Sequence, residues 1–181
     1  MTGVLVVTGA SRGIGAAIAR AGGASGYKVA VNYARGAEAA RAVVGEIERA
    51  GGKAITVQAN VSREKDIVDM FRTVDAKLGP VTALVNNAGQ LGMPSPVSAL
   101  TPDAVDALLH VNITSQFICA REAIRRMSPE AGGKGGAIVN IGSVAARIGG
   151  FPKCVAYAAS KGAIDSFTIG LAKEVAPLNI R

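Results

Sequence analysis

The sequence predicts an α/β fold in which two layers of helices enclose a parallel, doubly wound sheet of the Rossmann type. Three observations lead to this prediction. Strand patterns alternate with helix patterns along all 181 residues. The strands are apolar throughout and rich in β-branched residues, as in sheets that are buried on both faces. Polar or glycine-rich residues follow each strand, at the edge of the sheet where such folds bind ligands.

The first four elements each carry a local signal. Apolar residues before a glycine-rich turn indicate a strand over Val4–Thr8, and the pattern after the turn indicates a helix over Gly13–Ala24. Valines near the centre of Lys28–Tyr33 indicate a second strand. The helix Ala37–Ala50 is expected to end at Gly51-Gly52, because glycine readily adopts the backbone conformation that closes a helix.

The same alternation continues through the middle of the chain. A third strand is expected over Ala54–Gln58 and a fourth over Ala83–Asn86. Between them, apolar residues at helical spacing indicate a helix over Asp66–Leu78, which Gly79-Pro80 ends. The stretch Gln90–Leu100 is largely apolar and contains two prolines, so we expect a loop that forms one wall of a pocket for an apolar ligand.

The last third of the chain holds two helices and one strand. Thr101-Pro102 is typical of the start of a helix, which we expect to run to about Met127. A fifth strand is expected over Ala137–Ile141, and the last helix begins near Val155 and ends before Pro177. A sixth strand would normally follow. We therefore expect a single domain over residues 1–181 that is truncated, with its C-terminal strands missing.

Composition narrows the class of protein. Hydrophobic residues make up 49% of the chain, but no apolar run reaches the roughly 18 residues that a membrane-spanning helix needs. The N-terminus enters a strand directly, without the basic and apolar segments of a secretion signal, so a cytoplasmic location is expected. Cys119 and Cys154 are too few for a disulfide framework, and we interpret them as small buried side chains.

The net charge of +7 raises the question of a nucleic-acid partner. The basic residues are scattered, however, and three tyrosines and four phenylalanines offer few surfaces for base stacking. Arg121, Arg125 and Arg126 lie near one face of a predicted helix, and we interpret them as part of a solvated surface. Nothing besides the net charge favours nucleic-acid binding. We therefore expect neither a nucleic-acid partner nor a membrane.

The segment Thr8-Gly9-Ala10-Ser11-Arg12-Gly13-Ile14-Gly15 connects the first strand to the first helix. Glycine lets the backbone approach a ligand where a Cβ would collide. A helix N-terminus directs free N–H groups and the positive end of its dipole at an anion. This arrangement suits a pyrophosphate, although glycine-rich turns also simply join strands to helices.

A tyrosine and a lysine four residues apart form the strongest local signal. Tyr157 and Lys161 lie on one face of the last predicted helix, and Ser143 follows the fifth strand. A phenol ordinarily titrates near ~10, too high for easy proton transfer at neutral pH, but a nearby ammonium favours the phenolate. The phenol could then act as a general acid or base, with the serine as a donor to the reacting oxygen. Taken alone, the spacing also fits a half-buried helix with a surface lysine.

Together these motifs resemble the classical short-chain dehydrogenase/reductase family, in particular bacterial 3-oxoacyl-carrier-protein reductases and glucose 1-dehydrogenases. The resemblance covers the whole chain and includes Asn86-Asn87-Ala88-Gly89 and Asn112 in matching order and spacing. It implies that Tyr157 exchanges a proton with the substrate oxygen, that Ser143 orients this oxygen, and that Lys161 assists the tyrosine and binds the nicotinamide ribose. Asn112 would hold a water of the proton relay, and direct hydride transfer would need no metal.

The resemblance also implies a nicotinamide cofactor, and the residues after the second strand favour NADP(H) over NAD(H). NAD-selective members carry a carboxylate there, whereas this chain has Asn32, Tyr33 and Arg35. Arg12 offers another cation for a 2′-phosphate. The residues expected to bind the cofactor are Gly9, Ser11, Arg12, Gly13, Ile14, Gly15, Asn32, Tyr33, Arg35, Asn60, Val61, Asn87, Ala88, Gly89, Tyr157 and Lys161.

Further expectations concern the pocket, the assembly and the activity. Asn60 stands where the family usually has aspartate, and its amide oxygen could still accept a hydrogen bond from the adenine. The helices that carry Asn112 and Tyr157 pair with their copies in this family, so a homotetramer is expected. The sequence thus predicts an NADP(H)-dependent oxidoreductase that interconverts a small-molecule carbonyl and a secondary alcohol. The alternative is a non-catalytic dinucleotide sensor or scaffold on the same fold.

Overall fold

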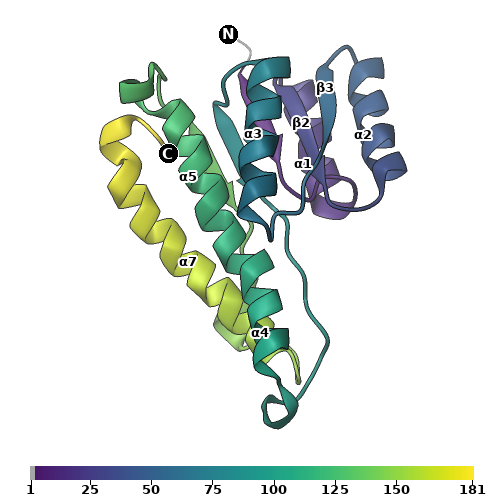
Figure 1. Ribbon diagram of the computed structural model, residues 1–181, viewed down its shortest axis with the longest axis vertical. Coiled ribbons are helices and arrows are strands. Elements are labelled where there is room, and N and C mark those ends of the chain that lie inside the picture. Colours follow the sequence, from purple (N-terminus) through teal and green to yellow (C-terminus); the bar gives the residue numbers. More distant parts are fainter. Residues whose placement is uncertain (1–2) are drawn as a thin grey trace.

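The computed structural model describes residues 3–181. Five parallel strands form one sheet in the order β3-β2-β1-β4-β5. Helices cover both faces of the sheet, so the predicted three-layer, doubly wound architecture is confirmed (Figure 1). In this order the direction of the crossovers reverses between β1 and β4, which is the point where folds of this kind bind ligands. Within residues 3–181, no helix is both long and apolar enough to cross a bilayer.

The predicted strands are all present, and so are the first three helices, with bounds shifted by at most two residues. The strands are β1 (Val4–Val7), β2 (Lys28–Tyr33), β3 (Lys53–Gln58), β4 (Ala83–Asn86) and β5 (Ala137–Asn140). The α-helices are α1 (Gly13–Ala24), α2 (Ala37–Arg49), α3 (Glu64–Leu78), α4 (Pro102–Leu109), α5 (Ser115–Met127), α6 (Ala145–Ile148) and α7 (Val155–Val175). Short 3₁₀ turns cover Val97–Ala99, Pro129–Ala131 and Ala176–Leu178.

The long helix predicted up to Met127 is interrupted by a π turn, η2 (His110–Thr114). Here the N–H of Ser115 donates to the carbonyl of His110, five residues earlier. Two helices therefore replace one, and α4 extends beyond the sheet at the bottom of Figure 1. Single π turns inside α-helices occur frequently at functional positions. This turn carries the predicted site residue Asn112.

The core consists of one apolar cluster on each face of the sheet. Val4 and Val6 of β1 belong to the cluster under α3 and α5, whereas Leu5 and Val7 belong to the cluster under α1 and α2. All four are at most 6% exposed. Successive side chains of a strand point to opposite faces, so a strand covered on both faces is apolar at every position. In Figure 1, α7 lies beside α5, and Val175 near its end joins the first cluster.

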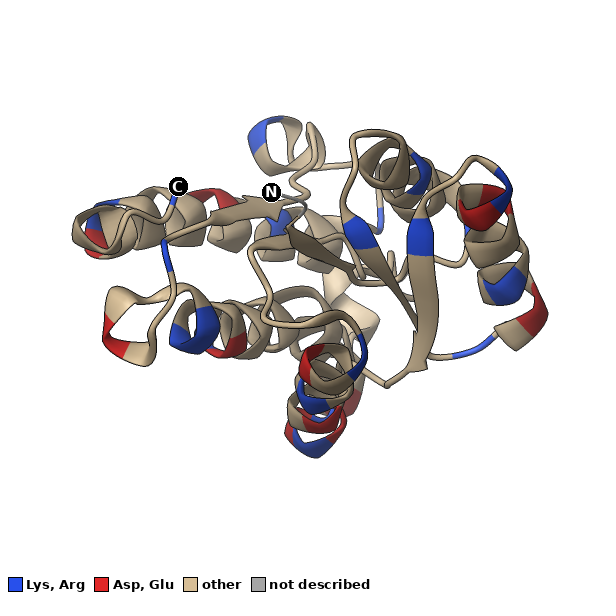
Figure 2. Ribbon diagram, turned by 90° about the horizontal axis from the view of Figure 1, so that it is seen from above, with Lys and Arg blue, Asp and Glu red and all other residues tan. Residues whose placement is uncertain are grey.

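The arginines of α5 form an ion-pair network. Arg125 is solvated as predicted, whereas the side chain of Arg126 is 16% exposed and does not belong to a solvated surface. Glu122 is 4% exposed and pairs with Arg121, Arg125 and Arg126 at 3.0 to 3.1 Å. Arg126 also pairs with Asp75 of α3 at 2.7 Å, so the network joins two helices. Burial raises the pKa of the Glu122 carboxyl, but its hydrogen bonds to the arginines outweigh this effect and lower it. The other Lys and Arg residues are spread over several elements (Figure 2).

Both cysteines are buried and free, as the sequence predicted. Burial away from water disfavours the thiolate of Cys119 and raises the pKa of its thiol to about 12. Because the thiolate is the reactive form of cysteine, this side chain is an inert part of the core at neutral pH.

Candidate active site

The turn between β1 and α1 forms an open cradle at the carboxyl end of the sheet. Gly9 and Gly13 have φ angles of 62° and 57°, in the left-handed region that other residues rarely adopt. A Cβ at Gly15 would lie 2.6 Å from the carbonyl oxygen of Gly9, so a side chain there would clash with the turn. No side chain caps the N-terminus of α1, which begins at Gly13. The cradle therefore fits a phosphate group held by backbone N–H groups.

Asn32, at the end of β2, supports this cradle through hydrogen bonds. Its side chain is 1% exposed, and its Nδ2 donates to the carbonyls of Val57 and Ala59 at 3.3 and 3.1 Å. Its Oδ1 accepts a hydrogen bond from the N–H of Gly9 at 3.1 Å. The amide thus ties the glycine turn to the neighbouring strand, and its polar atoms face protein backbone.

Asn87 and Thr8 link the cradle to the end of β4. The Nδ2 of Asn87 donates to the carbonyls of Thr8 and Gly9 at 2.9 and 3.1 Å. In return, the hydroxyl of Thr8 accepts from the N–H groups of Asn87 and Ala88, each at 3.0 Å. Thr8 is not among the predicted site residues, and its place directly before the first glycine is the only signal for its role.

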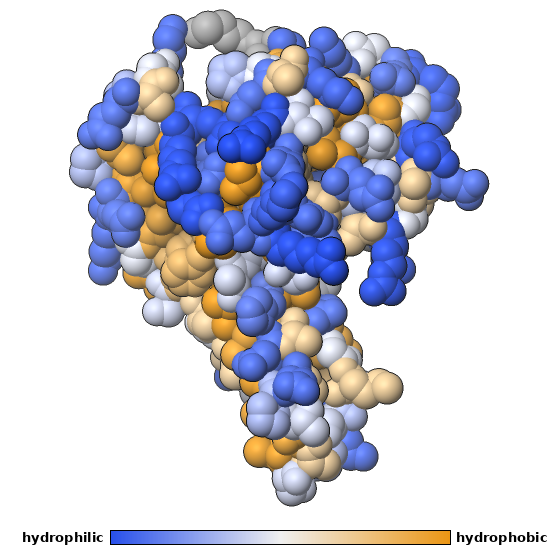
Figure 3. All heavy atoms as spheres, in the orientation of Figure 1, coloured by the Kyte–Doolittle hydropathy of each residue, from blue (hydrophilic) through white to orange (hydrophobic). Residues whose placement is uncertain are grey.

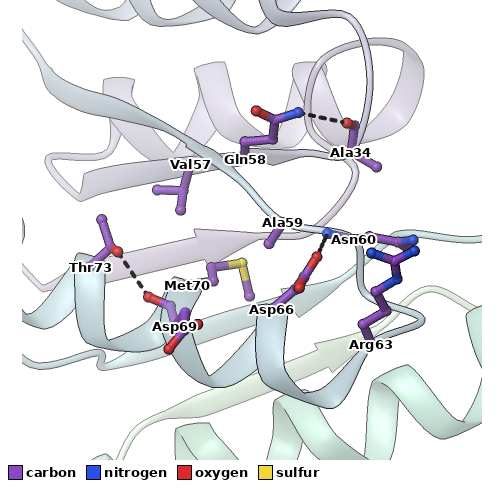
Figure 4. A pocket seen from close by; sticks show the side chains of 10 residues that line it. All are labelled: Ala34, Val57, Gln58, Ala59, Asn60, Arg63, Asp66, Asp69, Met70 and Thr73. Carbon is purple, nitrogen blue, oxygen red and sulfur yellow. Dashed lines mark hydrogen bonds between the residues drawn. The ribbon is translucent and has the colours of Figure 1, made fainter.

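Asn60 follows β3 and shapes a tight turn at the start of α3. Its Oδ1 accepts from the N–H and the hydroxyl of Ser62 at 3.1 and 2.9 Å, and its own N–H donates to Asp66 at 3.0 Å. The oxygen that we expected to face an adenine is therefore already bonded. Figure 4 shows Asn60 and Arg63 beside a cavity of 440 Å³ that also borders Ala34, which follows β2.

The two predicted phosphate-binding arginines remain on the surface. Arg12 and Arg35 are exposed and form no ion pair with any of residues 3–181. Arg12 is the last residue of the cradle, directly before α1, and Arg35 follows the end of β2. Both guanidinium groups are thus free to meet an anion from solvent. The other predicted cofactor residues nearby are Ser11 and Tyr33, which are half-buried, Ile14, which is 65% exposed, and Val61, which is buried.

Tyr157 and Lys161 share one face of α7, as their spacing predicts. The Nζ of Lys161 lies 6.0 Å from the centroid of the Tyr157 ring. Lys161 is 4% exposed, and its Nζ donates to the carbonyl of Ile141 at 2.6 Å. Burial lowers the pKa of the Lys161 ammonium, and the nearby carboxylate of Asp165 opposes this shift. Ser143 follows β5, and its hydroxyl accepts from the N–H of Ala145 at 3.2 Å.

Asn112 joins the π turn to the segment after β4 and to α7. It is fully buried, and its Nδ2 donates to the carbonyl of Gln90 at 2.9 Å and to the hydroxyl of Ser160 at 3.0 Å. Its Oδ1 accepts from the N–H of Gln90 at 2.8 Å. A Cβ at Gly89 would lie 3.5 Å from this Oδ1 and 3.8 Å from the Nζ of Lys161. Gln90 was expected only as part of a pocket wall and Ser160 not as a site residue, although each adjoins a predicted site residue.

A comparison with known protein families identifies the family of this chain. The family model described as short chain dehydrogenase matches residues 3–181. The chain belongs to the short chain dehydrogenase family. The resemblance of its motifs to that family is thereby confirmed, and the chain is an oxidoreductase.

Relatives in this family match nearly the whole chain. An uncharacterized oxidoreductase of Escherichia coli, YgfF, is 49% identical over 178 residues, which cover 98% of this chain and 72% of that protein. A 3-oxoacyl-(acyl-carrier-protein) reductase of Synechocystis is 40% identical over 173 residues, which cover 96% of this chain and 68% of the relative. The crystal structure of a short chain dehydrogenase from Burkholderia cenocepacia in complex with NADP has a TM-score of 0.91 at 38% identity, covering 98% of this chain and 70% of that one.

Proposed function

We propose that this oxidoreductase is NADP(H)-dependent and interconverts a carbonyl and a secondary alcohol, with Tyr157 as the general acid and base. One observation carries the proposal. A buried ammonium, that of Lys161, lies 6.0 Å from the centroid of the Tyr157 ring, and a Cβ at Gly89, after β4, would lie 3.8 Å from this ammonium. An ammonium close to a phenol favours its ionised form, as proton exchange with an alcohol or carbonyl oxygen requires.

The cradle and the two free arginines support NADP(H) as the cofactor. The turn keeps its shape because Gly9 and Gly15 lack side chains, which would clash with Ala88 and with the carbonyl of Gly9, respectively. Arg12 and Arg35 offer guanidinium groups for a 2′-phosphate, and residues 34–36, directly after β2, include no carboxylate to repel it. The relative from Burkholderia cenocepacia was crystallised with NADP. When bound, the nicotinamide gives or takes the hydride.

Each catalytic side chain has a separate task in this proposal. The hydroxyl of Tyr157 donates a proton to the carbonyl oxygen during reduction and removes one during oxidation. Ser143 donates a hydrogen bond to the same oxygen, where charge changes during the reaction. Lys161 assists the tyrosine and holds the nicotinamide ribose. Asn112 holds the water that passes protons from Lys161 towards solvent.

A pocket beside Tyr157 favours an apolar substrate. It has a volume of 190 Å³ and lies between the loop after β4 and the first turn of α7. Leu91, Met93, Leu100 and Leu108 line it, and Lys153 is its only charged lining residue. A cavity of roughly 150 Å³ with apolar walls accommodates one benzene ring. We therefore propose that the substrate carbonyl carries an apolar ring or a short apolar chain.

The test of the catalytic assignment is the variant Tyr157→Phe in the full-length protein. NADPH oxidation is followed by absorbance with a panel of aliphatic and aromatic ketones. Because the variant keeps the ring but loses the exchangeable proton, we expect kcat to fall by about 10²- to 10⁴-fold. The dissociation constant of NADPH should change little. Tyr27→Phe, directly before β2, serves as the matched control.

Turnover that survives Tyr157→Phe would overturn the proposed mechanism. Tight NADPH binding by wild-type protein with no turnover of any ketone or alcohol would instead favour the alternative, a dinucleotide sensor or scaffold. The cytoplasmic location stays a prediction from the sequence.

We also propose that the chain forms a homotetramer through α5, which continues from the π turn of Asn112, and α7, which carries Tyr157. A groove of 690 Å³ runs between them, and Figure 3 shows apolar atoms exposed along this region. Phe117 and Phe167 stack there with ring centroids 4.0 Å apart, and Phe117 remains 47% exposed. Light scattering of the full-length protein should give the mass of four chains, and Phe117→Asp should reduce it. A monomer mass for the wild type would contradict this assembly.

A further inference from the structure

Gln116 lies one helical turn beyond Asn112, the predicted relay residue, and contacts it directly. It is 1% exposed, which makes it one of the most deeply buried polar side chains described. Its Nε2 donates to the main-chain carbonyl of Asn112 at 3.1 Å. Neither the motifs nor the proposed mechanism uses this glutamine. Burying a polar side chain costs free energy unless its polar atoms are hydrogen-bonded.

The orientation of the Gln116 amide follows from its partner. A carbonyl oxygen can only accept a hydrogen bond, so the Nε2 must face Asn112 and the Oε1 must face the other way. This Oε1 is buried and has no hydrogen-bond partner among residues 3–181. Buried oxygens without a donor are rare in folded proteins, and an internal water commonly supplies the missing bond.

The backbone of Gln116 is tied to the strand ends at the same rim. The Nδ2 of Asn86, at the end of β4, donates to the Gln116 carbonyl at 3.4 Å and to the Oδ1 of Asn140 at 2.9 Å. The Nδ2 of Asn140 donates in turn to the hydroxyl of Thr168 on α7 at 2.9 Å. A continuous set of hydrogen bonds therefore runs from α7 through β5 and β4 to the π turn.

The π turn is also linked by hydrogen bonds to α7, the helix that carries Tyr157. The side chain of Asn112 donates to the hydroxyl of Ser160 at 3.0 Å, and this hydroxyl donates to the carbonyl of Tyr157 at 2.7 Å. Gln116 bonds the backbone of Asn112, whereas Ser160 and Gln90 bond its side chain, so these contacts together determine where Asn112 lies. A shift of the Asn112 carbonyl would move its amide relative to Gly89 and Lys161 as well.

We propose that Gln116 is a positioning residue for Asn112 and that its Oε1 binds an internal water. The Nε2 of Gln116 holds the π turn through the Asn112 carbonyl and so fixes the place of the residue proposed for the proton relay. This inference rests on the proposed function, because the relay matters only if Tyr157 exchanges protons with a substrate.

Two substitutions of nearly equal shape test the inference in the full-length protein. Gln116→Met keeps length and volume but removes the donor and the acceptor. Gln116→Glu keeps the shape, yet its carboxyl can donate to the Asn112 carbonyl only while protonated. Thr114→Val, at an exposed position of the same π turn, is the matched control. The measurements are kcat, the KM for NADPH, the solvent isotope effect and the thermal midpoint, each as a function of pH.

We expect Gln116→Met to lower kcat about tenfold or more, since small displacements of catalytic groups have effects of this size or larger. The KM for NADPH should stay within about twofold, and the solvent isotope effect should rise, because proton transfer becomes slower. For Gln116→Glu, the ratio of its kcat to that of wild type should be highest at acidic pH. It should fall as the carboxyl ionises, while the thermal midpoint shows the variant to be folded throughout.

Two results would overturn the inference. In one, Gln116→Met lowers the thermal midpoint but keeps the wild-type kcat and isotope effect, which would assign only a packing role. In the other, Gln116→Glu follows the wild-type pH profile. Amide hydrogen exchange over residues 110–115 provides a readout that is independent of activity. It should accelerate about tenfold in Gln116→Met but not in Thr114→Val, and unchanged exchange would refute the inference even if the proposed reaction itself proved wrong.

Discussion

The two ends of the sheet rim use polar side chains in opposite ways. Around the glycine cradle, the amides of Asn32 and Asn87 face backbone groups of neighbouring loops, whereas the cations Arg12 and Arg35 remain exposed and unpaired within residues 3–181. At the other end, the charged group Lys161 is buried and held by the carbonyl of Ile141.

This difference fits two different tasks. A phosphate group can be held by backbone N–H groups and flexible surface cations, so the protein needs only to keep the turn in shape. A proton-transfer site must instead hold its groups in fixed places, because its efficiency depends on their geometry. We therefore expect substitutions of amides at the cradle to act on folding, and those of its cations to act on cofactor choice.

The largest effect on stability should come from Asn32→Ala. The change removes three hydrogen bonds at the rim, those to the carbonyls of Val57 and Ala59 and the one from the N–H of Gly9, and a buried polar group that loses its partner costs about 1–3 kcal/mol. We expect the free energy of unfolding to fall by about 3 kcal/mol or more, measured by urea denaturation. Asn60→Ala is the matched control, since its oxygen bonds only the half-buried Ser62. Equal midpoints for both variants would show that the Asn32 bonds do not hold the cradle.

A smaller effect, now on binding, is expected for Arg12→Ala. Loss of a charged hydrogen bond to a 2′-phosphate should weaken NADPH binding by about tenfold to a hundredfold. NADH lacks this phosphate, so its dissociation constant should change by less than about twofold. Both are measured by fluorescence titration, with Arg49→Ala at the far end of α2 as the control. An equal loss for NADH and NADPH would exclude contact between Arg12 and the 2′-phosphate.

The smallest effect concerns the pH dependence of stability at the catalytic end. Burial lowers the pKa of Lys161 in the folded chain, whereas an unfolded lysine titrates near ~10.4. Between these two values the unfolded state binds more protons, so stability rises with pH, by no more than about 1.4 kcal/mol per unit for one group. Lys161→Met should remove this rise from denaturation curves measured on the alkaline side. A variant with the same slope as wild type would contradict the burial of a charged lysine.

Local patterns predicted the sheet and the flanking helices well, because strand and helix periods are properties of short segments. They failed at the π turn, where the pattern indicated one unbroken helix. That turn is accompanied by hydrogen bonds from Asn112 to Gln90 and Ser160, which lie 22 and 48 positions away. The short helix α6 after Ser143 also escaped prediction, because one helical turn carries too few residues to show a period.

The sequence by itself determined the layered fold and the pairing of Tyr157 with Lys161 on one helical face, since both follow from spacing along the chain. Only the tertiary structure decided which polar side chains remain free and which are bonded to the protein. Asn32, Asn60 and Asn112 look alike in the sequence, yet one holds the cradle, one shapes a turn and one joins the catalytic face. Their roles depend on partners brought together by folding. A hydrogen bond to a distant segment cannot be predicted from the residues next to the asparagine in the sequence.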